Sequence, residues 1–205
     1  MEFRRLGLVE FSPTFEAMKV FTAARTGATD DEIWLLQHPP VYTQGLSGRA
    51  EHVLDAGAIP VVHIDRGGQV TYHGPGQWIA YVLYDLRRAG MNVRELVESL
   101  ETAVINLLAD HGITAQGDPA ARGVYVRGRK IAALGLKVSR GRSYHGLSLN
   151  VDMDLSPFSG INPCGHEGLE VTSVQLEVGA DEPIDFTDLG ERLLHHLEQV
   201  LPSQT

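Results

Sequence analysis

The stretch GVYVRGRKIAALGLKV, residues 123–138, holds two runs of β-forming residues on either side of Arg127-Gly128. Two such runs around a short turn that contains glycine are typical of a β-hairpin. Because successive side chains of a strand point to opposite faces, Lys130 and Lys137 are expected on opposite faces of the second strand. Only a β-bulge, for which Gly135 is the candidate, would bring the two lysines together. The hairpin therefore predicts a sheet with Lys130 just after the turn.

The rest of the chain predicts further strands and three helices around this hairpin. Residues 2–11, 32–38, 58–65, 77–86 and 143–151 have the short apolar or alternating runs of strands. Residues 12–24, 92–112 and 185–201 have apolar residues at helical spacing, with Ser12 and Asn92 as N-caps and Pro13 at the first helical position. These elements predict an α/β fold of the α+β type, in which a mixed β-sheet has helices packed on it and residues 1–205 form one catalytic domain.

Composition limits the class of protein. The net charge of −9 argues against general binding of nucleic acids. The chain lacks an apolar run of about 18 residues and its first residues lack the apolar stretch of a secretory signal, so no membrane association is expected. A single cysteine cannot form an internal disulfide, and a zinc site usually needs several cysteine or histidine ligands. These features predict a cytoplasmic protein without a metal site.

Positive charge is concentrated in one segment of the chain. Residues 122–142 contain seven basic residues and no acidic residue, which leaves a net charge of −16 on the remainder (−9 minus 7). Such a basic strip on an acidic protein favours docking of an anionic partner, although a hairpin whose arginines face water would have the same composition. The strip consists of Arg122, Arg127, Arg129, Lys130, Lys137, Arg140 and Arg142.

The segment RGGQVTYHGPGQ, residues 66–77, holds four glycines in twelve residues. Glycines at this density permit tight turns or a close approach of a ligand to the backbone. The order of residues matches neither the P-loop nor the dinucleotide-binding fingerprint, so a nucleotide site is not predicted. Arg66, Tyr72 and His73 would suit a wall that faces a ligand, and a glycine-rich hairpin with a surface histidine fits the same residues.

The only cysteine, Cys164, lies in the turn-rich segment SPFSGINPCGHEG, residues 156–168. A free cysteine is most often a small buried apolar residue. Here the neighbours are polar or turn-forming, and functional residues gather in loops. Gly165 leaves a backbone N–H that could hold a developing oxyanion. A thiol also needs a cation or a base beside it to attack at neutral pH. The candidates for that group are Lys130, His73, His145 and His166.

Several of these segments together resemble the lipoyl(octanoyl) transferases, also called the lipoate–protein ligase B family. The matching segments are RGGQVTYHGPGQ (66–77), GRKIAALGLKV (128–138), HGLSLNV (145–151) and INPCG (161–165), with a weaker match in HPPVYTQG (38–45). The first and last segments are highly specific, whereas the terminal parts of the chain match loosely. The resemblance implies a fold similar to the catalytic domains of lipoate ligases and biotin protein ligases.

The resemblance also implies a reaction. An octanoyl or lipoyl group would move from acyl carrier protein to a specific lysine of a lipoyl domain, the first step of endogenous protein lipoylation. Cys164 would hold the acyl group as a thioester, and Lys130, not Lys137, would assist it. If burial lowers the pKa of Lys130, its amine would take the thiol proton; if Lys130 stays charged, it would stabilise the thiolate. The residues implied to bind the acyl group are Arg66, Gly67, Gly68, Gln69, Val70, Thr71, Tyr72, His73, Ala133, Leu134, Gly135, Gly146, Leu147 and Ser148.

The implied donor is octanoyl-acyl carrier protein, which is acidic and would suit the basic strip. The implied acceptors are apo lipoyl domains of 2-oxoacid dehydrogenase E2 subunits and the glycine cleavage H protein. No ATP or metal is expected, because a thioester donor is already activated. Three alternatives remain: an ATP-dependent lipoate ligase, a cysteine hydrolase that releases free fatty acid, and an acyl-binding module without catalysis.

Overall fold

The computed structural model describes residues 1–202, whose strands form a seven-stranded sheet and a three-stranded sheet. The large sheet has the order β1 (Glu2–Leu8), β2 (Glu32–Gln37), β6 (Gln77–Leu83), β10 (Arg142–Asn150), β9 (Arg129–Ser139), β8 (Gly123–Val126) and β7 (Gln116–Gly117). The small sheet has the order β4 (Val61–His63), β3 (Val41–Gln44) and β5 (Val70–His73). The α-helices are α1 (Phe11–Ala24), α2 (Leu86–Ala89), α3 (Val93–Asp110), α4 (Val174–Val178) and α5 (Phe186–Val200), with 3₁₀ turns η1 (Ala50–His52), η2 (Ser156–Gly160) and η3 (Pro163–Gly165).

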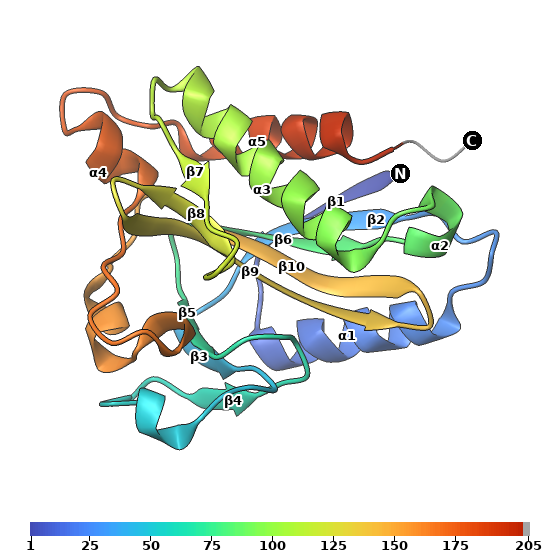
Figure 1. Ribbon diagram of the computed structural model, residues 1–205, viewed down its shortest axis with the longest axis horizontal. Helices are drawn as coiled ribbons and strands as arrows, with labels where there is room; N and C mark the ends of the chain where they lie inside the picture. The colour runs from blue at the N-terminus through green and yellow to red at the C-terminus, as the bar shows by residue number, and fades with distance from the viewer. Residues whose placement is uncertain (203–205) are drawn as a thin grey trace.

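The helices cover both faces of the large sheet. Helices α3 and α5 lie side by side on one face, whereas α1 and the small sheet lie on the other (Figure 1). Strand β1 is parallel to β2, and the β2–β6, β6–β10, β10–β9 and β9–β8 pairs are antiparallel. This arrangement confirms the predicted mixed sheet with packed helices. No helix within residues 1–202 is both long and apolar enough to cross a membrane.

The larger core lies between the sheet and helices α3 and α5. Leucines such as Leu100 of α3 and Leu193 of α5 are completely buried there, as the helical spacing predicted. Asn92 caps α3, because its side chain accepts from the Glu95 N–H at 3.0 Å and the Glu95 carboxylate accepts from the Asn92 N–H at 2.7 Å. Such a capping box satisfies two backbone donors that a helix leaves unpaired. The predicted start of this helix is therefore confirmed.

The predicted hairpin is confirmed, and its second strand contains a bulge. Arg127 and Gly128 join β8 to β9 with φ angles of 50° and 82°, the positive values of a tight hairpin turn. Along the two strands Val124 pairs with Ala132 and Tyr125 pairs with Lys130, so the residue between them is skipped. The bulge therefore lies at Ile131 and not at Gly135, the candidate position, where β9 pairs with β10 in unbroken register.

The bulge at Ile131 reverses the expected alternation of β9. Ile131 and Ala132 both lie in the core under α3, and Lys130 lines a small cavity together with Ala133. The physical reason is a second pairing partner. The Lys130 N–H donates to the Glu170 carbonyl at 2.9 Å, and the Thr172 N–H donates to the Lys130 carbonyl at 2.9 Å. Residues 170–172 thus pair with the backbone of Lys130 at the bulge, where the pairing of β9 with β8 is interrupted.

Some predicted element boundaries were wrong. Strand β1 ends at Leu8 and α1 begins at Phe11, so Glu10 and not Ser12 is its N-cap residue. Pro13 consequently lies in the first turn, where a missing N–H costs no helical hydrogen bond.

Two further strands are shorter than predicted. Strand β4 covers residues 61–63 of the predicted 58–65. Strand β6 ends at Leu83 rather than at residue 86, because Asp85 caps α2 by accepting from the N–H groups of Arg87 and Arg88.

Candidate active site

A cavity of about 400 Å³ lies between the glycine-rich segment before β5 and the strands β9 and β10. It brings together three segments that the sequence analysis assigned to acyl binding. The predicted residues that line it are Arg66, Gly67, Gly68, Gln69, Val70, Thr71, His73, Ala133, Leu134, Gly135, Gly146, Leu147 and Ser148, together with Cys164. Tyr72 is not among the lining residues. Its ring packs instead against Tyr42 and Phe158, with each pair of centroids 5.5 Å apart.

Four small residues form the floor of the cavity. Ala133 pairs with Ser148 and Gly135 pairs with Gly146 across β9 and β10. Gly146 has no room for a side chain, because an added Cβ would lie 2.0 Å from the Ala80 carbonyl oxygen of β6. The small side chains leave a shallow apolar bed on the sheet, which a linear alkyl chain fits.

Part of the cavity lining comes from residues that the sequence analysis did not single out. Phe11 at the start of α1 and Ile79 and Tyr81 of β6 line it and are nearly inaccessible to solvent. Val93 and Val97 of α3 also contribute. Locally these residues follow the ordinary apolar pattern of a helix and a strand, so no signal in the sequence separates them from the core.

Cys164 lies at the edge of this cavity in a conformation that few residues other than glycine adopt. Its φ of 56° and ψ of 17° place it in the left-handed region, at a cost of about 1 kcal/mol or more. The loop around it is tied to η1, because the Asn162 N–H donates to the His52 carbonyl at 2.8 Å. The surrounding backbone therefore holds the thiol in one place.

Lys130 is the candidate partner that contacts the sulfur. Its Nζ lies 2.9 Å from Cys164 Sγ and 3.1 Å from the Arg122 carbonyl oxygen. The Nζ atom also lies 5.2 Å from the centre of the Tyr125 ring, within the range of a cation–π interaction. Burial by itself would lower the pKa of Lys130, but the adjacent Cys164 sulfur outweighs it and the net direction is upward. Of the two alternatives left open by the sequence, this favours a lysine that stays charged.

The histidines proposed as bases are held by other partners. His73 Nδ1 lies 2.8 Å from Gln77 Oε1, and His145 Nε2 lies 3.0 Å from Asp65 Oδ1. Burial lowers the pKa of His73 to about 3 and that of His145 to about 4, so both are neutral near pH 7. The third histidine, His166, lines the cavity.

The backbone N–H of Gly165 is already used. It donates to the Asn162 carbonyl at 2.9 Å and closes the 3₁₀ turn that presents Cys164. The expectation that this N–H is open to an oxyanion was therefore wrong. The sequence could not show this, because the hydrogen bond exists only once the loop adopts its turn.

A buried guanidinium underlies the glycine-rich segment. Arg66 donates to the Thr43 carbonyl at 2.6 Å and to the Gly67 carbonyl at 3.0 Å, and its Nε has no hydrogen-bond partner within residues 1–202. Burial lowers its pKa to about 10, which leaves it charged at neutral pH. The cavity therefore contains a fixed positive charge. In the same described part of the chain, no group of three His, Cys, Asp or Glu side chains is arranged to hold a metal ion.

Most charges of the basic strip are paired with acidic residues from distant segments. Arg129 Nη2 lies 2.7 Å from Glu177 Oε1, and Arg127 contacts the same buried carboxylate. Arg122 Nη1 lies 3.5 Å from Glu101 Oε2. These pairs neutralise part of the predicted docking surface.

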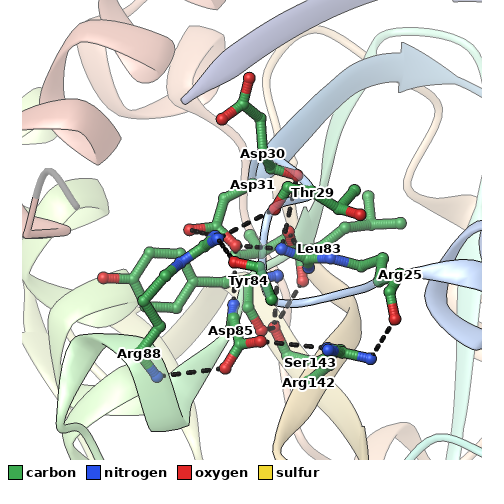
Figure 2. Close-up of polar contacts among 12 residues, drawn as sticks. Arg25, Thr29, Asp30, Asp31, Leu83, Tyr84, Asp85, Arg88, Arg142 and Ser143 are labelled. Atoms are coloured by element: carbon green, nitrogen blue, oxygen red, sulfur yellow. Dashed lines mark hydrogen bonds and ion pairs between the residues drawn. The ribbon is translucent and has the colours of Figure 1, made fainter. Parts of the chain in front are cut away.

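Arg142 belongs to a buried network at the start of β10 (Figure 2). Its Nε lies 3.0 Å from Asp85 Oδ2, and nearby Asp31 pairs with Arg25 and Arg88. A docking role for Arg127 or Arg142 is therefore not supported. Besides Lys130, which contacts Cys164, Lys137 and Arg140 are the strip residues for which residues 1–202 provide no ion pair with a carboxylate.

The fold is that of known ligases. A bi-partite lipoate protein ligase from Thermoplasma acidophilum superimposes with a TM-score of 0.75 at 17% identity, over 98% of this chain and 84% of that chain. Biotin protein ligase from Aquifex aeolicus superimposes with a TM-score of 0.58 at 11% identity, over 98% of this chain and 69% of that chain. The predicted similarity of fold to lipoate ligases and biotin protein ligases is confirmed.

Sequence similarity is more specific. A protein named octanoyltransferase from Laribacter hongkongensis (strain HLHK9) is 55% identical over 198 residues, which cover 97% of this chain and 94% of that protein. The family model of the lipoyl protein ligase A/B catalytic domain matches residues 13–198. The chain therefore belongs to the lipoyl protein ligase A/B catalytic-domain family.

Proposed function

We propose that this acyltransferase moves an octanoyl group from an acyl-carrier thioester to a lysine of a lipoyl domain through an acyl thioester on Cys164. The observation that supports this most directly is the 2.9 Å contact of Lys130 Nζ with Cys164 Sγ at the edge of an apolar cavity. An ammonium favours the thiolate form of an adjacent cysteine, and the thiolate is the nucleophile. The cavity residues would hold the alkyl chain.

In the first half-reaction the Cys164 thiolate attacks the thioester carbonyl of the donor. A new bond forms between sulfur and the acyl carbon, and the bond to the carrier thiol breaks. Lys130 is close enough to the sulfur to give its proton to the departing carrier thiolate. The products are acyl-Cys164, a neutral Lys130 and a free carrier thiol.

In the second half-reaction the neutral amine of the acceptor lysine attacks acyl-Cys164. An amide bond forms, the bond to sulfur breaks, and the proton of the attacking amine passes to Lys130. Acylation removes the anion that raises the pKa of Lys130, while burial, which lowers that pKa, remains. The same lysine would therefore act as an acid in the first step and as a base in the second.

The cavity lining would bind the alkyl tail of an octanoyl group. The lining combines the bed of small residues on β9 and β10 with apolar side chains such as Phe11 and Ile79. Burial of each methylene group of the tail would stabilise the complex by about 0.8 kcal/mol. Because the donor is already a thioester, the proposed reaction needs no ATP or other cofactor.

The proposed donor is octanoyl-acyl carrier protein, and the proposed acceptors are apo lipoyl domains of 2-oxoacid dehydrogenase E2 subunits and the glycine cleavage H protein. Lys137 and Arg140 are the remaining candidates for contact with an acidic carrier. The cytoplasm would suit the reaction, because a reducing compartment keeps Cys164 a free thiol. We infer that the chain, 1–205, acts as one catalytic domain; residues 203–205 lie outside the described residues.

Intact-mass measurement tests the proposal. The protein is mixed with octanoyl-carrier protein without ATP, and a mass increase of one octanoyl group is expected. Cys164→Ala should show none while its melting temperature stays close to that of the parent protein. Addition of an apo lipoyl domain should remove the adduct and acylate the domain. An adduct that persists in Cys164→Ala would contradict the covalent mechanism.

Other outcomes of this experiment identify the alternatives. Acylation of the domain from free octanoate and ATP, but not from the carrier thioester, would indicate an ATP-dependent ligase. Release of free octanoate in the presence of the lipoyl domain would indicate a hydrolase. Binding of the donor with neither an adduct nor transfer would leave an acyl-binding module.

A further inference from the structure

We propose that Glu101, a buried carboxylate of α3, is a positioning residue that holds Lys130 in its charged form through the peptide bond between Arg122 and Gly123. The inference rests on the proposed function, because it assigns a residue that supports the Cys164–Lys130 pair. Nothing in the local sequence singled out Glu101, which lies on a helix face otherwise occupied by apolar residues.

One peptide group connects Glu101 to Lys130. The Gly123 N–H donates to Glu101 Oε1 at 3.1 Å. The carbonyl of the same peptide, that of Arg122, accepts from Lys130 Nζ at 3.1 Å. Glu101 is only 6% exposed, so these contacts form away from bulk water. The carboxylate, the peptide and the ammonium thus form a continuous hydrogen-bonded chain that ends at the Cys164 sulfur.

The hydrogen bonds from Glu101 to Cys164 all favour the same charge state of Lys130. A negative acceptor on the N–H of a peptide polarises the peptide and makes its carbonyl a stronger acceptor. A stronger acceptor favours the ammonium form of Lys130 over the neutral amine. The ammonium in turn favours the Cys164 thiolate. Because hydrogen bonds in a chain strengthen one another at low dielectric, the effect of Glu101 reaches the sulfur without direct contact.

The peptide is packed directly against the lysine. Gly123 has a φ of +148°, and a Cβ added there would lie 2.8 Å from Lys130 Cε and 3.1 Å from Lys130 Nζ. Only glycine therefore allows the Arg122 carbonyl to approach the ammonium. Other groups that titrate or carry charge around Lys130 are Cys164 of η3, Tyr125 of β8 and the Arg122 guanidinium, which lies 3.5 Å from Glu101 Oε2.

The rate of alkylation of Cys164 as a function of pH tests the inference. Cys164 is the only cysteine, so iodoacetamide reports on this thiol alone. Glu101→Gln keeps an acceptor for the Gly123 N–H but removes its charge. We expect it to move the profile to higher pH and to slow alkylation at pH 6 about three- to tenfold, the size of coupling typical within one hydrogen-bonded network. Lys130→Met should shift the profile further in the same direction.

Matched variants separate the proposed route from other effects. Arg122→Met leaves the carbonyl but removes the guanidinium that pairs with Glu101, so its profile should not move to higher pH. Glu191→Gln removes an exposed carboxylate that pairs with Arg5 and should also have no effect. Glu101→Asp tests the geometry, because the shorter side chain withdraws from the Gly123 N–H. It should also move the alkylation profile to higher pH. If Glu101→Gln fails to fold, Glu101→Asp provides the test.

The outcomes distinguish the two proposals. An unchanged profile in Lys130→Met would remove the activating pair and with it the mechanism proposed above. A shift in Lys130→Met without a shift in the Glu101 variants would overturn the role of Glu101 alone, since a purely structural residue lowers the melting temperature without moving the profile. A shift to higher pH in Arg122→Met as large as that in Glu101→Gln would overturn the route through the peptide.

Discussion

Replacement of Phe11 by leucine should change which acyl chain the protein prefers. Phe11 lines the large cavity and is 5% exposed. It does not line the small cavity that Cys164, Lys130, Ala133 and Ser148 share. Its ring stacks on that of Phe15, which stacks in turn on His145 of β10. We expect the proposed octanoyl tail to meet Phe11 with its terminal methylene groups.

The size of the effect follows from the atoms removed. Leucine has three fewer side-chain carbons than phenylalanine, which makes room for about two more methylene groups of the acyl tail. At about 0.8 kcal/mol for each buried methylene, a decanoyl donor should gain about 1.6 kcal/mol relative to octanoyl. This corresponds to a change of about 15-fold in the ratio of kcat/KM values for the two donors.

Competition between the two donors measures this ratio directly. Equal amounts of octanoyl- and decanoyl-carrier protein are mixed with the protein, and the two adducts are counted by intact mass. Phe21→Leu is the matched control, because Phe21 lies on the same helix and packs near Trp34 instead of lining the cavity. An unchanged ratio in Phe11→Leu, or an equal change in Phe21→Leu, would refute the placement of the tail.

Further predictions concern charge and pH. Lys137→Glu combined with Arg140→Glu should raise the KM for the carrier-bound donor at low salt and lose this effect at high salt; an unchanged KM at low salt would show that docking lies elsewhere. Arg142→Met should instead lower the free energy of unfolding by about 2 kcal/mol in urea titrations, because it removes one of the cationic partners of buried Asp85; a loss in docking with unchanged stability would contradict this. Three buried histidines should make the protein less stable in acid. Burial lowers the pKa of each histidine in the folded state below 6.5, so the unfolded state binds more protons below that pH. The stability that is present above about pH 6.5 is therefore lost toward pH 4. The loss is up to about 1.4 kcal/mol per pH unit for each histidine. A free energy of unfolding that stays constant between pH 7 and pH 5 would contradict this assignment. The three are His38, His73 and His145.

The sequence predicted the elements better than their exact ends or their contacts. The Asn92 cap and the Arg127-Gly128 turn were visible because each depends on a few neighbouring residues. The start of α1 was misplaced by two residues, because Ser12 and Pro13 have the residue types of a cap and a first helical position. The bulge at Ile131 was also invisible, because residues 170–172, far along the chain, pair with the backbone there.

In the candidate site, too, local motifs were predictable and contacts between distant segments were not. Its cysteine and lysine were identified by their resemblance to family motifs, but strand alternation alone placed Lys130 on the wrong face. The available backbone donor expected at Gly165 is used by the turn itself. The cavity wall at Phe11 comes from a helix that precedes Cys164 by about 150 residues, so no local pattern marks it.

By itself, the amino-acid sequence determined the hairpin, the amphipathic helices and the family to which the chain belongs, because these depend on periodicity, turn chemistry and short motifs. Only the tertiary structure decided which charges remain available and which side chains surround the thiol. Arg142 pairs with Asp85, and Arg127 pairs with Glu177. Lys130 contacts both Cys164 and the Arg122–Gly123 peptide group, which is hydrogen-bonded to Glu101. Charge pairing and hydrogen bonding act through space at a few ångströms, and that proximity exists only after distant segments have packed together.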